Sequence, residues 1–108
     1  MATIDDLQKL DIRVGTFTSV EPIEGSEKLY KELVDFGSEI GQRQILSGIQ
    51  KYFTPEELVG RQALFIVNLE PRQMMGFESN GMLLATDNDE APVLLVPDSK
   101  VPNGSKIH

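Results

Sequence analysis

Apolar and polar residues alternate, or apolar residues run together, over several short stretches of this chain, which is typical of β-strands with one or both faces buried. The stretches predicted as strands are residues 11–17, 28–36, 42–49, 62–69, 81–86 and 93–96. Gly15 predicts a bulge or bend in the first strand, because a glycine inside a strand often marks such a distortion. Residues 37–41 and 87–90 contain the glycines or the acidic and amide residues that favour turns.

The clearest helix signal is the sequence T-P-E-E-L-V-G at residues 54–60. Thr54 is suited to accept a hydrogen bond at the N-cap, Pro55 suits the first helical position, and Glu57 completes a capping box. We therefore predict one or two helical turns here. A second short helix is expected near the N-terminus, over about residues 4–9.

The order of these elements indicates a fold class. Five or more short strands, with one short helix between the third and the fourth, suit an all-β, five-stranded oligonucleotide/oligosaccharide-binding (OB) Greek-key barrel. A βαβ sheet would need a crossover helix between every pair of parallel strands. With 108 residues, the chain is expected to form a single domain over residues 1–108.

Composition limits the location of the protein. The apolar runs are too short to cross a bilayer, so no membrane association is expected. The N-terminus M-A-T-I-D-D-L has neither the basic start nor the apolar block of a secretory signal. A cytoplasmic location is the expectation.

The chemical inventory argues against catalysis. There is no cysteine, and the only histidine is His108, so thiolate nucleophiles, cysteine-bound zinc and histidine general bases are not expected. A glycine-rich phosphate loop, a G-x-S-x-G elbow and an H-E-x-x-H helix are also absent. The sequence therefore predicts a non-catalytic binding domain that uses no metal and no cofactor.

The net charge of −7 argues against a nucleic-acid partner, because phosphate binding normally needs clustered lysine and arginine. The distribution of charge weakens this objection. Residues 40–76 carry a net charge of +1, and the remaining residues carry −8. The acidic residues are therefore concentrated towards the two ends of the chain.

Residues 68–84, N-L-E-P-R-Q-M-M-G-F-E-S-N-G-M-L-L, have two interpretations. They could form a loop between the fourth and fifth strands, with Met74, Met75 and Phe77 as local packing. They could also border the ligand face of a barrel, where Phe77 or a methionine contacts a base and Arg72 contacts a phosphate. The residues with hydrogen-bonding side chains in this second interpretation are Asn68, Ser79 and Asn80.

Five motifs occur in an order that resembles a known family. They are D-I-R-V-G at 11–15, S-E-K-L-Y at 26–30, L-S-G-I at 46–49, N-L-E-P-R at 68–72 and G-x-x-S-x-G-M-L-L-A at 76–85. The chain resembles the tRNA-binding domain found at the C-terminus of many methionyl-tRNA synthetases, as a separate synthetase beta subunit, and as a stand-alone dimeric tRNA-binding protein. The resemblance extends from about Ile4 to Ile107.

This resemblance implies an OB barrel whose C-terminal β extension forms a homodimer. It also implies binding to the tRNA body by shape, without a reaction, and the catalytic chain of a methionyl-tRNA synthetase as a further partner where the domain is fused or bound to one. The residues that the resemblance assigns to the tRNA surface are Lys28, Arg43, Ser47, Asn68, Arg72, Ser79 and Met82.

Two alternatives stay open. Gln73, Met74 and Met75 stand where the family often has further basic residues, and R-Q-x-x-G-F at 72–77 is similar to a dimeric secretion-chaperone branch of the fold, which binds unfolded or preprotein segments. Against this branch, the sequence S-N-G-M at 79–82 follows the synthetase pattern. A purely structural dimerisation module for a synthetase is the other alternative.

Overall fold

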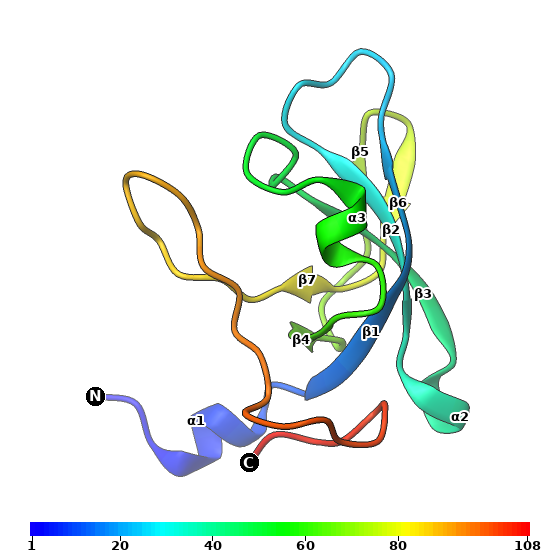
Figure 1. Cartoon of the computed structure of the whole chain (residues 1–108). Helices are drawn as coiled ribbons and strands as arrows, with labels where there is room; N and C mark the ends of the chain where they lie inside the picture. Colours follow the sequence, from blue (N-terminus) through cyan, green and yellow to red (C-terminus); the bar gives the residue numbers. More distant parts are fainter.

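The computed structural model describes all residues from 1 to 108, and its main feature is a curled five-stranded antiparallel sheet (Figure 1). The strand order is β3-β2-β1-β4-β7. The strands are β1 (Ile12–Pro22), β2 (Tyr30–Asp35), β3 (Gln42–Ser47), β4 (Gln62–Ile66) and β7 (Met82–Leu83). The edges β3 and β7 approach each other, so the sheet forms a nearly closed barrel, and the predicted all-β fold is confirmed.

The long strand β1 joins the two halves of the barrel. Its first half pairs with β4 and its second half pairs with β2. The register shifts between Phe17 and Ser19, so the bulge lies there and the prediction of a bulge at Gly15 is wrong. Gly15 instead allows close packing, because a Cβ atom at this position would lie 2.5 Å from Cγ1 of Val34 and 2.7 Å from Cε1 of Phe36.

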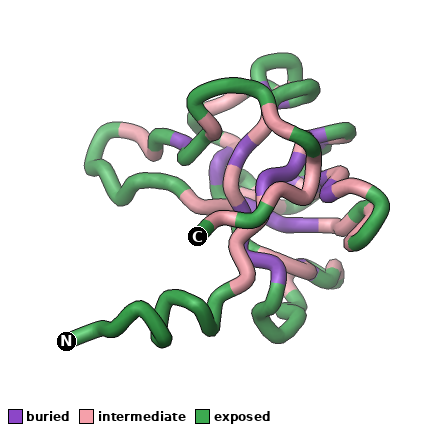
Figure 2. Tube along the Cα trace, turned by 90° about the horizontal axis from the view of Figure 1, so that it is seen from below, coloured by how far each residue is buried: buried purple, intermediate pink, exposed green.

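The core consists of inward-facing residues from all the long strands, which form the buried part of the barrel in Figure 2. Phe65 is at its centre, with ring centroids 5.5 Å from Phe17 and 5.3 Å from Phe36, both edge to face. Helix α3 (Pro55–Leu58) adds the fully buried Leu58 to this core. The predicted capping box of α3 is present.

Both predicted short helices are present, and the chain has a third. The predicted N-terminal helix is α1 (Ile4–Gln8), and an unpredicted helix α2 (Gly37–Ile40) replaces the expected turn at 37–41. Asp35 Oδ1 accepts a 2.8 Å hydrogen bond from Gly37 N, and Gly41 N donates to Gly37 O, which closes one helical turn. Every helix has five residues or fewer, so none is long enough to span a lipid bilayer.

The C-terminal segment follows β1 without forming a regular strand. Gly104 N donates to Val14 O, Val14 N donates to Ser105 O, and Ile107 N donates to Ile12 O. The expected C-terminal β extension is therefore present only as this irregular pairing with β1. The predicted strand at 93–96 is reduced to one bridge between Ala85 and Leu94, because the prolines on either side of it, Pro92 and Pro97, cannot donate to a ladder.

Candidate functional site

Residues 68–84 contain a β-hairpin where a loop was expected. Strands β5 (Arg72–Met74) and β6 (Phe77–Ser79) pair antiparallel, and the tip is formed by Met75 and Gly76. Both tip residues have positive φ, 51° and 82°, which is the geometry of the two-residue turn that matches the twist of paired strands. The glycine at 76 makes this turn possible, since it adopts positive φ without steric cost.

The hairpin is held against the barrel by two kinds of contact. Lys31 Nζ lies 4.6 Å from the centre of the Phe77 ring, within the range of a cation–π interaction. Gln44 Nε2 donates a 3.0 Å hydrogen bond to Glu78 O. Phe77 is half-buried and already contacts the chain, which agrees with its interpretation as local packing.

Ser79 closes the gap between the two edge strands of the barrel. Its Oγ accepts a 3.0 Å hydrogen bond from Leu46 N of β3 and donates a 3.1 Å hydrogen bond to Gly81 O. One residue further on, Asn80 N donates to Gln44 O at 2.8 Å. The opening between β3 and β7, which we call the seam, is thus bridged by a buried side chain in place of a full ladder.

Two shallow hollows lie along the seam and share Leu46 and Met82. The first, called the seam hollow, has a volume of about 160 Å³ and is lined by Leu46, Ser47, Gly48, Ile49, Met82, Leu83 and Ala85. The second, called the hairpin hollow, has about 90 Å³ and includes Glu70, Arg72 and Ser79 in its wall. Four of the seven expected site residues therefore surround one continuous surface: Ser47, Arg72, Ser79 and Met82.

Lys28 lies close to this surface. It is exposed in the loop before β2, and its carbonyl oxygen accepts a 3.0 Å hydrogen bond from Gln50 N, next to Ile49 of the seam hollow. Lys28 and Arg72 thus approach the seam from its two ends.

Arg43 and Asn68 have their polar groups committed to the fold. Arg43 Nη1 donates to the backbone oxygens of Val67 and Asn80. Asn68 Oδ1 accepts from Asp11 N and its Nδ2 donates to Lys9 O, both at 2.8 Å, which joins the end of β4 to the segment after α1. Both residues therefore stabilise the fold; of the other five expected residues, four line the seam and Lys28 lies close to it.

A buried glutamate behind the seam was missed by the sequence analysis. Glu32 is fully buried on β2, its Oε1 accepts a 2.8 Å hydrogen bond from Ser47 Oγ, and its Oε2 has no partner. Burial raises the pKa of Glu32 to about 8, and the hydrogen bond from Ser47 opposes this only in part. The alternation Tyr30, Glu32, Val34 along β2 was the available signal, because it places Glu32 on the inward face.

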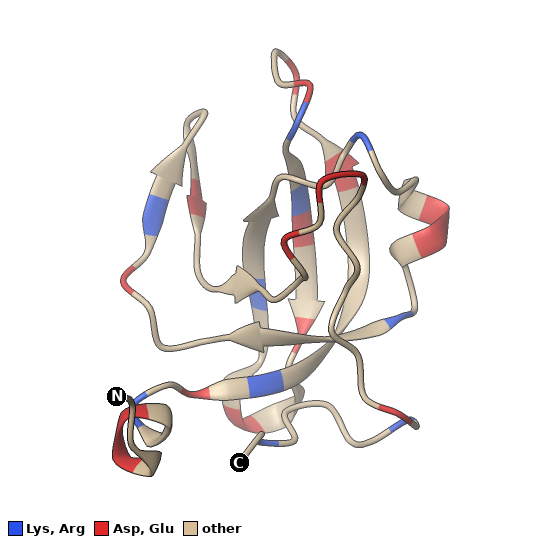
Figure 3. Ribbon diagram, turned by 90° about the vertical axis from the view of Figure 1, so that its left-hand side faces the viewer, with Lys and Arg blue, Asp and Glu red and all other residues tan.

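The charges near the seam are mixed, with basic and acidic positions close together on the hairpin and the neighbouring loops (Figure 3). Lys31 Nζ lies 3.8 Å from a carboxylate oxygen of Glu21. No three carboxylate or imidazole side chains come close enough together to hold a metal ion.

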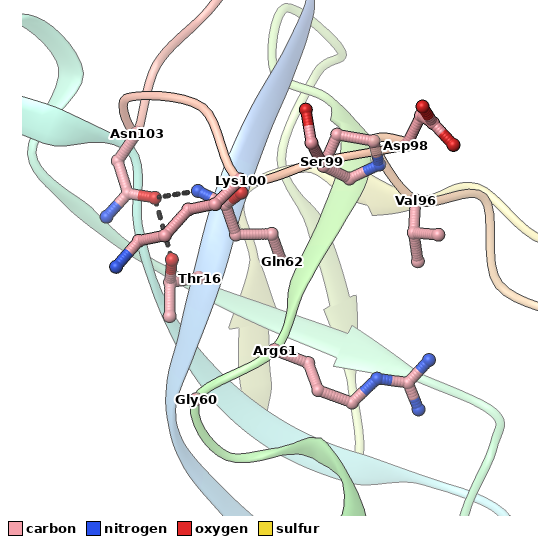
Figure 4. A pocket seen from close by; sticks show the side chains of 10 residues that line it. Thr16, Gly60, Arg61, Gln62, Val96, Asp98, Ser99, Lys100 and Asn103 are labelled. Atoms are coloured by element: carbon pink, nitrogen blue, oxygen red, sulfur yellow. Dashed lines mark hydrogen bonds between the residues drawn. The ribbon is translucent and has the colours of Figure 1, made fainter.

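A wider depression lies beside the C-terminal segment, away from the expected residues (Figure 4). Its polar side chains bind one another: Asn103 Oδ1 accepts from Thr16 Oγ1 at 2.7 Å and from Gln62 Nε2 at 3.0 Å. Gln62 also donates to the oxygen of Val101 at 2.7 Å. This cluster fastens the C-terminal segment to β1 and β4, and Arg61 and Lys100 line it.

Comparisons with known proteins agree on one family. The sequence model of a tRNA binding domain matches residues 12–106. The chain is 47% identical over 105 residues to methionine–tRNA ligase of Caldanaerobacter subterraneus and 50% identical over 103 residues to that of Methanothrix thermoacetophila. These matches cover 97% and 95% of this chain but only 16% and 15% of the relatives' length.

Two solved structures are also similar over nearly their whole length. The chaperone CsaA from Bacillus anthracis is 36% identical, with a TM-score of 0.89, and the match covers 100% of this chain and 99% of that one. A MetRS related protein from Pyrococcus horikoshii is 34% identical, with a TM-score of 0.91, covering 100% and 98%.

Proposed function

The chain belongs to the tRNA-binding domain family, and from this premise we propose that it binds tRNA through the seam as a homodimer and catalyses no reaction itself. The observation that carries the proposal is the clustering of Ser47, Arg72, Ser79 and Met82, four residues expected at the tRNA surface, around the two hollows of the seam.

The binding is proposed to rest on few phosphate contacts. Lys28 and Arg72 are exposed at or near the ends of the seam, and Lys51 is exposed two residues after Ile49. Three such contacts give a slope of log K against log salt of about −3. Phosphate contacts position a protein on its RNA without reading the sequence, so binding to the body of many tRNAs by shape is expected. The affinity is proposed to be micromolar.

The homodimer is proposed to form through α1 and the end of the C-terminal segment. Helix α1 contributes no buried residue, as Figure 2 shows, although Ile4, Leu7 and Leu10 are apolar and exposed by 68%, 43% and 37%. These three side chains and Ile107 line one depression of about 420 Å³. A second copy covering this surface would present two seams, and the second contact would gain from a high effective concentration.

The relation to the ligases suggests a biological setting. The chain corresponds to about one-sixth of the length of the methionine–tRNA ligases that it matches. We propose that it adds tRNA affinity to a methionyl-tRNA synthetase catalytic chain, either as an appended domain or as a separate beta subunit.

Arg72→Ala tests the electrostatic part of this proposal in a filter-binding titration of bulk tRNA at several salt concentrations. We expect a three- to tenfold weaker affinity and a slope less steep by about one unit, because one phosphate contact is lost. The matched control is Arg61→Ala in the depression of Figure 4, which removes the same charge far from the seam. A wild-type affinity that does not change with salt would contradict the proposal.

A second candidate function is the binding of unfolded or preprotein segments. The observation in its favour is Met75, which is 52% exposed at the tip of the hairpin. The similar solved structure of the chaperone CsaA agrees with it. Replacing Met74 and Met75 together by alanine should weaken the binding of an unfolded peptide and leave tRNA binding intact if this function holds, whereas Arg72→Ala should do the reverse.

A further inference from the structure

Two backbone N–H groups at the seam hollow, those of Gly48 and Ala85, have no hydrogen-bond partner in the chain. Leu46 N faces the seam, where it donates to Ser79 Oγ. Gly48 lies two residues further on, so its N–H continues the same strand edge. Neither Gly48 N nor Ala85 N, on the opposite wall, donates a hydrogen bond within the protein, and both residues are exposed.

The size and lining of the seam hollow suit one flat ring. Its volume of about 160 Å³ is below the range of about 300 Å³ and more that holds whole small molecules. Leu46 and Met82 form apolar walls, and the thioether of methionine makes favourable contacts with aromatic rings. A nucleobase offers such a ring, and its edge carries the acceptors that free N–H groups can bind.

The charges beside the hollow match an RNA backbone. Arg72 lines the adjoining hairpin hollow, and Lys28 lies at the opposite end, next to the loop that follows Gly48. A base inserted between them would bring the phosphates on its two sides towards these cations. An extended peptide fits less well, because Cα atoms of β3 and β7 come within 8 Å of each other, whereas two strands that flank a third lie about 9.5 Å apart.

We propose that the seam hollow binds one unstacked base of the RNA, with Leu46 and Met82 against its ring and the N–H groups of Gly48 and Ala85 towards its acceptor edge. This inference rests on the proposed function. It adds a requirement that phosphate contacts do not impose: the bound RNA must present a base that is free of its stack.

Ala85→Leu tests the inference by filling the hollow without changing any charge, and Met82→Ala tests it by removing one wall. Each should weaken tRNA binding about tenfold, since contacts to a single base contribute on this scale. The salt slope should stay at its wild-type value, in contrast to Arg72→Ala. The control is Ala91→Leu, which adds the same side chain to the acidic loop and should bind as the wild type does.

A direct measurement does not depend on variants. Adenosine, guanosine, cytidine and uridine, titrated separately into ¹⁵N-labelled wild-type protein, should shift the amide resonances of Gly48 and Ala85, and ribose 5-phosphate should not. If wild-type protein binds tRNA but Ala85→Leu binds it equally well and no nucleoside shifts these resonances, the base site is overturned while the proposed function stands. If an unfolded peptide shifts them instead, the hollow is a peptide site. If the wild type does not bind tRNA, both proposals fail.

Discussion

Glu32→Gln is the substitution whose effect follows most directly from the structure. The carboxyl group lies inside the barrel, bonded to Ser47 Oγ through Oε1, while Oε2 has no partner. Burial raises the pKa of Glu32 to about 8, from an ordinary value of 4.5. The folded protein therefore keeps a proton at neutral pH that the unfolded chain releases.

The size and sign of the effect come from this difference in pKa. Below about pH 4.5 the side chain is protonated in both states, and folding carries no penalty from it. Between pH 4.5 and about 8 the free energy of unfolding should fall by about 1.4 kcal/mol per pH unit, which amounts to about 3 kcal/mol at pH 7. Above about pH 8 Glu32 is ionised in both states, so its contribution becomes constant.

Glutamine has nearly the same shape and does not titrate. Urea unfolding of both proteins at pH 5.5 and pH 7.5 should show that the wild type loses about 3 kcal/mol more than Glu32→Gln between these two values. Equal pH dependence of the two proteins would refute the argument, as would a Glu32 carboxyl carbon resonance that titrates near pH 4.5.

Two further substitutions test other parts of the structure. Leu7→Glu places a charge on the exposed apolar face of α1, so sedimentation should show a monomer, and tRNA binding should weaken at least tenfold through the loss of the second seam. Gly15→Ala places a methyl group 2.5 Å from Cγ1 of Val34, so it should lower the free energy of unfolding by about 1–3 kcal/mol in a urea titration. The control Gly48→Ala has no atom within 4 Å of the new methyl group and should be nearly neutral for stability.

The parts of the fold that follow from local pattern were predicted from the sequence. Strand alternation located all five barrel strands, and the capping residues located α3, because both signals depend on neighbours along the chain. Helix α2 and the hairpin β5–β6 were missed for a different reason. The first is closed by a side chain of Asp35, and the second depends on Met75 adopting positive φ, which a non-glycine residue seldom does.

For the site, sequence motifs selected the residues but could not assign their tasks. Ser79 and Met82 were expected to contact tRNA, yet Ser79 is buried and bridges β3 to the turn before β7, while Met82 is exposed. The side-chain amide of Asn68 joins β4 to the segment after α1 by hydrogen bonds, one of them between residues 57 positions apart in the chain. Such tasks depend on tertiary packing, which no local pattern encodes.

The protein has a net charge of −7, yet its proposed ligand, tRNA, is also negatively charged. The binding free energy can be divided into a part that depends on salt and a part that does not, and this division shows how the two can still bind. A micromolar affinity corresponds to about −8 kcal/mol, and with a salt slope of about −3 the electrostatic share at 0.15 M salt is about −3 kcal/mol. About −5 kcal/mol must then come from contacts that salt does not weaken, and the seam hollow is the surface available for them. Extrapolation of the tRNA titration to 1 M salt should therefore leave a Kd of about 0.2 mM. A Kd that approaches 1 M on extrapolation would mean that phosphate contacts supply all of the affinity, and the hollow would then not contribute to binding.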